Sequence, residues 1–543
     1  MSAGQKETGD YQMLKNLAFI IKIYEDFIRT NEDDVHACDK LKLNSFFECI
    51  SDSLMPLLDL FERLEADGVA FKLGLVLPPV LCSMLEDEKI KSLYVEFLDK
   101  RIALGKKELN RYKNDQKASE LVSSTVEKNK ALKKRFTDDY ESNLVKQFAA
   151  WQRKGNVEIL GTCATDIFMP YYADLPEALS AQVEMGLQSY KKSFGELPDG
   201  FFLPEFGYTP GIEKIIRSYG YIYTILHSRS ILLTDNPPAN GIFYPVRTDN
   251  SLGLFTADPL IKNQILGEEG YSASSVYRNE NRDIGFELDL RKLTPILEEK
   301  SPRCSTGYKY WKKDFSDDAA VSYSIADAAA QAQKDADDFI ENRNEYLSKA
   351  AECAKDVDYV ASVCCINEGE VRKQWAEYLL WLEAVIRKTS NTELNLCLCK
   401  DMVSKQFSLE KIIPYYSAGA GDGYGENLLS SKNCWMMRYV RKATERMIDL
   451  AERFPSDTGL KTRLLNIGAL ELLLAQSSSL AKMIEEDDFS EYADRRFRLA
   501  INAFTVVFDA LGSNTVSTEW LTKLELMDNL FPWINYKIFS IKK

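Results

Sequence analysis

The stretch GFFLPEFGYTP, residues 200–210, carries the signal on which both the expected fold and the expected site depend. It starts as a short apolar strand and breaks off at Pro204 and Glu205, with the aromatic residues Phe206 and Tyr208 close behind. In enzymes built as barrels of parallel strands, the active site lies at the carboxyl ends of the strands. A carboxylate at such an end, among aromatic side chains that suit sugar rings, can attack an anomeric carbon or stabilise an oxocarbenium ion. The alternative interpretation is a strand-end acid that only caps the next helix.

Similar apolar segments recur on both sides of this stretch. They are continuous apolar runs without strict alternation, which is typical of parallel strands buried on both faces. The clearest are LAFIIKIY (17–24), VAFKLGLVL (69–77), VEILGT (157–162), GFFLPE (200–205), YIYTIL (221–226), GIFYPV (241–246) and YVASVCC (359–365). Helical periodicity fills much of the sequence between them. Seven strands that alternate with helices predict an α/β fold of the (β/α)7 barrel type.

Other regions show helical spacing without a strand. Residues 88–150 are rich in lysine and glutamate, and we expect a helical insertion whose charge run forms a solvated helix face. Residues 317–350 predict one long helix, and the sequence from about 427 onward is helical throughout. The expected division is therefore a barrel domain over 1–410, interrupted by the insertion, and a C-terminal helical domain over 411–543.

Composition limits the classes of partner. The chain has 543 residues, of which 45% are hydrophobic and 11% aromatic, so it can bury a large core and is not globally disordered. The 68 Lys and Arg residues against 82 Asp and Glu residues give a formal net charge of −14. Because an acidic chain grips phosphate backbones and anionic membranes poorly, we expect no nucleic-acid or membrane partner and a neutral polar ligand.

Targeting signals and cysteine usage point to the cytoplasm as the expected location. The start MSAGQKETGDYQ does not resemble a secretory signal, and no run of about 18 apolar residues predicts a membrane span. The eleven cysteines, among them the adjacent Cys364 and Cys365, do not form the pattern of a disulfide framework. Histidine occurs only at His36 and His227, so we expect neither a histidine-built metal site nor a cofactor held by one.

Three further segments are candidates for the site. In VYRNENRDIGFELDL (276–290), Arg282 and Asp283 either orient a substrate hydroxyl or form an ordinary loop salt bridge. The glycine-rich SAGAGDGYGEN (417–427) predicts a loop with unusual backbone angles, and it lacks the GK[ST] and the preceding strand of a phosphate-binding loop. Trp375 either packs in the core or provides a stacking platform for a sugar.

Taken in order, these segments resemble glycoside hydrolase family 57, and within it the members related to 1,4-α-glucan branching enzymes. The resemblance extends from about residue 15 to about residue 510. It is carried by FFECISDSLMPLLDLFERLEADGVAFKLGLVLPPVLCSML (46–85), VEILGTCATDIFMP (157–170), GFFLPEFGYTPGIE (200–213), HSRSILLTDNPPANGIFYPV (227–246), YRNENRDIGFE (277–287), STGYKYWK (305–312) and LLNIGALELLLAQSS (464–478). YRNENRDIGFE is similar to the YREFYRDIGF of the family.

The resemblance implies a seven-stranded (β/α) barrel with a helical insertion and a C-terminal helical domain. It implies an enzyme that acts on α-glucans or oligosaccharides by a retaining mechanism without a metal or other cofactor. Glu205 matches the nucleophile. The expected substrate-binding residues are Tyr208, His227, Arg282, Asp283, Trp375, Asp166, Lys22 and Tyr24.

Several family positions carry other residues in this chain. Lys22 and Tyr24 stand where the first motif has histidines, and Asp166 stands where the second has a histidine. Without gaps, Asn367 aligns with the aspartate that acts as general acid. Gly419 takes the place of a tryptophan in the glycine-rich loop. Ser479 and Leu480 replace an Asp-Trp pair.

These differences leave two hypotheses open. An amide at Asn367 has no proton to donate at neutral pH, and general acid–base catalysis supplies about 10²- to 10⁴-fold in rate. The chain is therefore either an active branching enzyme or 4-α-glucanotransferase that uses Glu205, or a degenerate member that binds glucan or a protein partner. A lysine at position 22 close to Glu205 would pair with it. Glu370 reaches the site only if its loop is rebuilt, and Glu368 points elsewhere.

Overall fold

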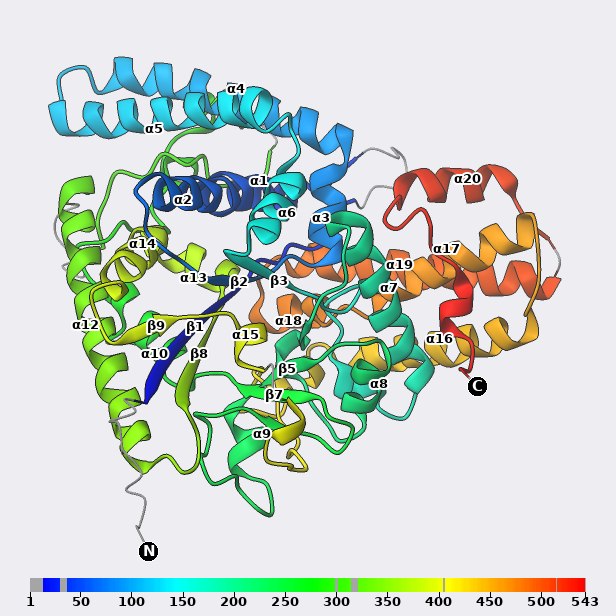
Figure 1. The fold of residues 1–543 in the computed structure, drawn as a ribbon. Coiled ribbons are helices and arrows are strands. Elements are labelled where there is room, and N and C mark those ends of the chain that lie inside the picture. Colours follow the sequence, from blue (N-terminus) through cyan, green and yellow to red (C-terminus); the bar gives the residue numbers. More distant parts are fainter. Residues whose placement is uncertain are drawn as a thin grey trace, which may run out of the picture.

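The computed structural model of the chain describes residues 13–29, 37–297, 301–313, 321–403, 406–513 and 515–542. His36 lies outside the described residues. Strands form the centre of the first three quarters of the molecule, helices surround them, and the C-terminal helices pack together on one side (Figure 1). The mixed α/β fold and the mostly helical C-terminal region expected from the sequence are confirmed.

Seven parallel strands follow one another in a closed order. They are β1 (Leu14–Lys22), β2 (Leu73–Val76), β3 (Val157–Leu160), β4 (Gly200–Phe202), β5 (Tyr223–Leu226), β7 (Gly253–Thr256) and β8 (Tyr359–Asn367). Parallel ladders join β3, β2, β1 and β8 in one sheet and β4, β5 and β7 in the other. Single parallel bridges, Gly161 with Phe201 and Ala257 with Val363, join β3 to β4 and β7 to β8. The short β9 (Leu394–Leu396) pairs with the first half of β1.

The sixth of the seven parallel strands is not the one that the sequence predicts. GIFYPV was expected to form a strand over 241–246, but only its end contributes, as the two-residue β6 (Val246–Arg247), which runs antiparallel to β7. The peptide before Val246 lacks regular structure, and proline cannot donate to a ladder at Pro245. The sixth parallel strand, which pairs with β5, is Gly253–Thr256, and it has only two large apolar residues, Leu254 and Phe255.

Burial on both faces explains the continuous apolar runs. In β1, Leu17, Phe19 and Ile21 belong to the large core between strands and helices. The alternate residues Ala18 and Ile20 join a smaller cluster enclosed by the strands, which other strands complete. Because successive side chains of a strand point to opposite faces, both sets must be apolar.

The helices cover the outside of the strands. Those outside the insertion and the C-terminal region are α1 (Lys40–Cys49), α2 (Met55–Ala66), α3 (Pro79–Glu86), α7 (Pro176–Phe194), α8 (Ile212–Ser218), α9 (Ser228–Leu232), α10 (Ile261–Leu266), α11 (Ile284–Glu287), α12 (Ile325–Cys353), α13 (Glu368–Gln374), α14 (Tyr378–Thr389) and α15 (Cys399–Met402). The long helix expected over 317–350 is α12. Its first described turn begins after Ser324, whose hydroxyl accepts the backbone N–H of Asp327. Residues 317–320 of that prediction lie outside the described residues.

The remaining helices form two groups. The region 88–150 contains α4 (Glu88–Arg111), α5 (Gln116–Lys134) and most of α6 (Leu144–Lys154), and α4 and α5 form a hairpin at the edge of the molecule (Figure 1). The C-terminal helices are α16 (Cys434–Arg453), α17 (Leu460–Ala475), α18 (Ser478–Glu486), α19 (Ser490–Ser513) and α20 (Thr518–Met527). No helix in the described part of the chain is long and apolar enough to cross a membrane.

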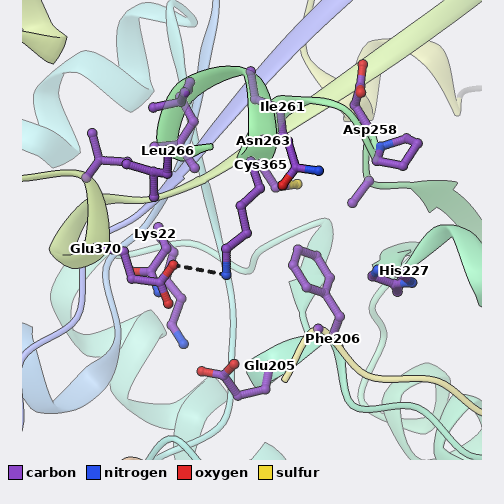
Figure 2. A pocket seen from close by; sticks show the side chains of 18 of the residues that line it. Lys22, Glu205, Phe206, His227, Asp258, Ile261, Asn263, Leu266, Cys365 and Glu370 are labelled. Atoms are coloured by element: carbon purple, nitrogen blue, oxygen red, sulfur yellow. Dashed lines mark ion pairs between the residues drawn. The ribbon is translucent and has the colours of Figure 1, made fainter. Parts of the chain in front are cut away.

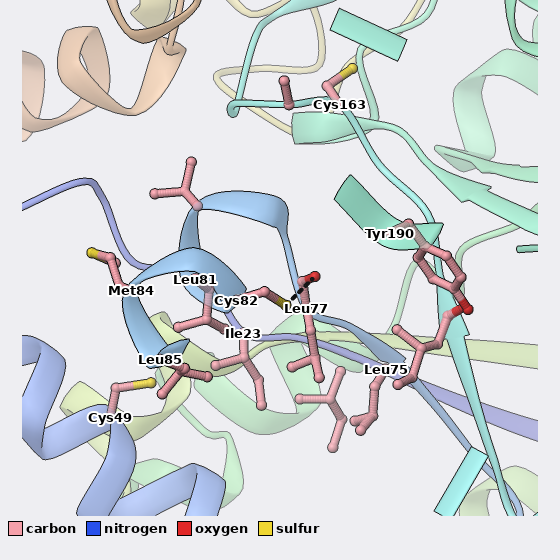
Figure 3. Close-up of a cluster of buried hydrophobic side chains, with 14 of the residues drawn as sticks. Ile23, Cys49, Leu75, Leu77, Leu81, Cys82, Met84, Leu85, Cys163 and Tyr190 are labelled. Carbon is pink, nitrogen blue, oxygen red and sulfur yellow. Dashed lines mark hydrogen bonds between the residues drawn. The ribbon is translucent and has the colours of Figure 1, made fainter. Parts of the chain in front are cut away.

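A tightly packed part of the core supports the carboxyl ends of β1 and β2. Leu75 of β2, Leu77 after it and Leu81 of α3 gather around Ile23, the residue that follows β1 by one position (Figure 3). All four side chains are buried. Because a close-packed interior has low compressibility, this packing restricts movement of the Lys22 backbone at the end of β1.

Candidate active site

A cavity of about 240 Å³ lies at the carboxyl ends of the parallel strands. Its polar walls come from residues at or just after the ends of different strands, which are Lys22, Glu205, His227, Asp258 and Asn367, together with Glu370 of α13. Apolar walls come from Phe206 and from Ile261 and Leu266 of α10 (Figure 2). The cavity therefore unites four of the residues expected from the sequence with residues that were not expected.

Glu205 is held in an unusual backbone conformation. It lies in a 3₁₀ turn directly after β4, with φ of 50°, and Phe206 follows with φ of 48°. Left-handed backbone angles are unfavourable for residues other than glycine and cluster at functional sites. The carbonyl of Glu205 accepts the backbone N–H of Gly419 at 2.6 Å. This turn directs the Glu205 carboxylate into the cavity on the side of Lys22 (Figure 2).

The glycine-rich loop supports this turn from behind. A Cβ at Gly419 would lie 2.8 Å from Cδ2 of Phe206 and 3.3 Å from the carbonyl oxygen of Glu205. Only glycine permits so close an approach of the two backbones. Gly421 and Gly423 in the same loop have positive φ, as the glycine pattern predicts.

Lys22 pairs with Asp166 and not with Glu205, which corrects the expectation from the sequence. The Lys22 ammonium donates to Oδ1 of Asp166 at 2.7 Å, and both side chains are buried. Burial works to lower the pKa of Lys22, but the charges of Asp166 and Glu205 outweigh it and raise that pKa. Burial raises the pKa of Asp166, and Lys22 opposes this rise only in part. Asp166 is thus the partner of a buried pair beneath the cavity and does not line it.

Tyr24 also lies outside the cavity lining. Its hydroxyl donates to Oδ1 of Asp26 at 3.0 Å and lies 3.2 Å and 3.3 Å from the hydroxyls of Ser477 and Ser479. The residue that replaces a family histidine therefore connects β1 with the start of α18.

A lysine of the C-terminal region links the two carboxylates of the cavity. Nζ of Lys482, in α18, lies 2.9 Å from Oε1 of Glu370 and 3.8 Å from Oε1 of Glu205. Lys262 of α10 adds a second contact to Glu370 at 3.3 Å, which is the dashed pair in Figure 2. Burial alone would raise the pKa of Glu370, but Lys482 and Lys262 outweigh it and hold that pKa at about 2. Glu370 is consequently ionised at neutral pH.

The two glutamates after β8 point in different directions. Helix α13 starts directly at Glu368 and changes the direction of the chain after β8, so Glu370 faces the cavity. The sequence alone left open whether Glu370 reaches the site. Glu368 is fully buried, and it accepts from Arg372 at 2.7 Å and from the hydroxyl of Ser53. The expectation that Glu368 points elsewhere is confirmed.

His227 and Asn367 occupy strand ends that line the cavity. His227 caps α9, and its Nδ1 accepts the backbone N–H of Arg229 at 3.3 Å. Burial, together with the charge of Arg229, lowers the pKa of His227, so its imidazole is neutral at pH 7. Asn367 is the last residue of β8 and pairs in register with Lys22 across the sheet.

Four expected substrate-binding residues lie away from this cavity. Tyr208 is buried and donates its hydroxyl to Glu213 at 3.0 Å. Arg282 pairs with Glu287 on the surface at 2.6 Å. Asp283 is buried and accepts hydrogen bonds from residues 285 and 305–307, so it stabilises a loop. Trp375 is fully buried against other aromatic rings, which makes it a core residue.

Asn263 and three charged residues of the site were not predicted. Asp258 follows β7, the strand that the sequence did not reveal, and its carboxylate lies 3.3 Å from the buried Arg343. Lys262 is in the short helix after it. Lys482 lies in α18, far along the chain from the strands of the site. Its spacing of one helical turn from Ser479 is the only sequence signal that could have indicated a place near the site.

Known proteins are similar to this chain over most of its length. The family model "Glycosyl hydrolase family 57" matches residues 18–415, and the model "1,4-alpha-glucan branching enzyme, C-terminal" matches residues 439–539. The 1,4-alpha-glucan branching enzyme TK1436 of Thermococcus kodakarensis is 24% identical over 511 residues, which cover 89% of this chain and 73% of that protein.

Solved structures have the same fold. The alpha-amylase AmyC of Thermotoga maritima is 25% identical, with a TM-score of 0.89 over 98% of this chain and 100% of that one. The branching enzyme of Pyrococcus horikoshii is 21% identical, with a TM-score of 0.84 over 97% of both chains. With a family model matched over most of its length, the chain belongs to glycosyl hydrolase family 57.

Proposed function

We propose that the protein is an α-glucan-active enzyme of the branching enzyme or amylase type, and that Glu205 is the nucleophile of a retaining mechanism. The observation that carries this proposal is the strained turn after β4, which directs the Glu205 carboxylate into the cavity. The closed order of the seven parallel strands supports a (β/α)7 barrel with this site at its carboxyl-terminal face. We take 1–410, including the insertion 88–150, as the barrel domain and 411–543 as the C-terminal helical domain.

The second carboxylate of the site is suited to hold a charge and unsuited to donate a proton. Glu205 and Glu370 approach the same ammonium, so their oxygens lie at most about 7 Å apart, near the separation of about 5–5.5 Å found in retaining enzymes. Glu370, however, has a pKa of about 2. Asn367, at the position that resembles the general acid, is an amide. We therefore expect slow cleavage of ordinary glycosidic bonds, lower by about 10²- to 10⁴-fold than with a general acid.

A second candidate function is binding without catalysis. It is favoured by the ionised state of Glu370, the carboxyl group that shares the Lys482 ammonium with Glu205. In that case the protein binds a glucan or a protein partner and leaves it unchanged.

Donors with different leaving groups separate the two candidates. Purified protein is incubated with amylose, while new α-1,6 linkages and new reducing ends are followed, and separately with α-maltosyl fluoride, whose fluoride departs without a proton. We expect fluoride release that falls at least about 10³-fold in Glu205→Gln, with little turnover of amylose. Glu196→Gln, an exposed carboxylate, is the matched control. Absence of fluoride release, with maltooligosaccharide binding retained, would establish the binding-only candidate.

A further inference from the structure

Hydrogen-bond donors lie on the side of the cavity that faces Glu205. Lys262 and Lys482 bring two ammonium groups to Glu370. The side-chain amides of Asn263 and Asn367 line the same cavity. A glycosidase with an ordinary sugar leaving group needs an acid on this side, and this chain has cations and amides there.

A leaving group that departs as an anion has the opposite requirement. Its departure needs no proton, and the charge that develops on it is stabilised by cations and by N–H donors. Lysine ammonium groups bind phosphate as point charges through charge-assisted hydrogen bonds. The Lys262 side chain is 68% exposed, so it is free to turn from Glu370 toward a ligand.

The size of the cavity is consistent with a compact donor. At about 240 Å³ it is smaller than the pockets of about 300–1,000 Å³ that enclose drug-sized ligands. The apolar side chains of Ile261 and Leu266 form part of its wall.

Resting on the proposed role of Glu205, we propose that the glycosyl donor of this site is an α-glucosyl phosphate. A carboxylate oxygen of Glu205 forms a bond to the anomeric carbon, and the bond from that carbon to the phosphate oxygen breaks. The donor reacts as its phosphate monoanion. The electron pair leaves with phosphate, which departs between Lys262 and Lys482 as the hydrogen phosphate dianion, keeping the proton that the donor already carried. Glu205 becomes a neutral ester, so the Lys482 ammonium loses one of its two carboxylate neighbours and is free to pair with the phosphate.

The second step regenerates the enzyme. A hydroxyl group of water or of an acceptor sugar attacks the anomeric carbon, and the bond to Glu205 breaks with its electron pair returning to the carboxylate. The proton of the attacking hydroxyl passes to Glu370, which is ionised and faces the cavity, and then to solvent. The products are free phosphate and a glucosyl unit that retains its α configuration.

The test compares two donors that differ only in the leaving group. Release of phosphate from α-glucose 1-phosphate is measured beside release of fluoride from α-glucosyl fluoride, in wild type, Glu205→Gln, Lys262→Met, Lys482→Met and Lys411→Met. Lys411 is an exposed lysine that pairs with Asp249 away from the cavity. We expect both donors to be consumed by wild type and by Lys411→Met, and neither by Glu205→Gln. In Lys262→Met and Lys482→Met, kcat/KM for the phosphate should fall about 10- to 100-fold more than for the fluoride, as one charge-assisted hydrogen bond predicts.

The results that would contradict the phosphate donor differ from those that would contradict the role of Glu205. Fluoride release without phosphate release would overturn the phosphate donor and leave the role of Glu205 intact. Failure with both donors would overturn the proposed function itself. Phosphate release that persists in Glu205→Gln, or equal losses for both donors in the lysine variants, would also refute the inference.

Discussion

Glu205 and Phe206 depend on one small residue for their backbone conformation. A methyl group at Gly419 would meet Cδ2 of Phe206 at 2.8 Å, and either the loop or the turn must shift. Since a misplacement of about 1 Å can cost about 10²-fold in rate, we expect Gly419→Ala to lower kcat/KM for α-maltosyl fluoride by about 10- to 100-fold. Gly369→Ala is the control, because its Cβ would have its nearest neighbour at 3.8 Å. Equal activity in the two variants would show that the loop does not position the nucleophile.

His227 links stability to pH. Burial and Arg229 lower its pKa in the folded protein, whereas in the unfolded chain it titrates near 6.5. Between these two values the unfolded state binds more protons, so the free energy of unfolding falls as the pH drops. Urea unfolding at pH 7.5 and pH 5.5 should therefore show a larger loss for wild type than for His227→Gln. Equal losses in both proteins would contradict the neutral, buried imidazole.

At the scale of elements, the α4–α5 hairpin is fixed to the rest of the molecule through a glycine. A Cβ at Gly105 of α4 would lie 2.2 Å from the hydroxyl of Tyr308 and 2.3 Å from Cγ2 of Val126. Overpacking of a buried contact costs about 1–3 kcal/mol, and we expect Gly105→Ala to destabilise the protein by this amount in urea unfolding. Gly512→Ala, in α19 with open space around it, should be neutral or stabilising by up to about 1 kcal/mol. The same change in both glycines would show that the hairpin does not pack at Gly105.

Most strands could be predicted because they are continuous apolar runs, and the exceptions have local causes. GIFYPV has the composition of a strand but ends in only two strand residues, since Pro245 cannot donate to a ladder. Gly253–Thr256 has only two large apolar residues, Leu254 and Phe255, so it does not form a continuous apolar run. Trp375 has the spacing of a helix residue, and spacing alone cannot distinguish a buried aromatic from an exposed platform.

At the scale of the whole molecule, the site is completed by a region distant in sequence. The backbone N–H of Ser478, at the start of α18, donates to the carbonyl of Asp166 at 2.8 Å, and one turn further along the helix Lys482 reaches Glu370. Glu205 could be placed from the sequence because it follows a strand, and the resemblance to the family indicated His227, Lys22 and Asn367. Lys482 could not be placed, because its position depends on how the C-terminal helices pack against the strands. The positive charge beside Glu205 and Glu370 therefore depends on tertiary packing, which the local sequence does not reveal.

The most direct test of the central claim is to trap the glycosyl-enzyme intermediate. Wild-type protein is incubated with 5-fluoro-α-glucosyl fluoride, and intact-protein mass spectrometry followed by peptide mapping locates the adduct. Glu205 as nucleophile predicts one glycosyl group per chain, on the peptide that contains GFFLPEFGYTP, and none in Glu205→Gln. An adduct on another carboxylate, or no adduct while fluoride is released, would contradict the account.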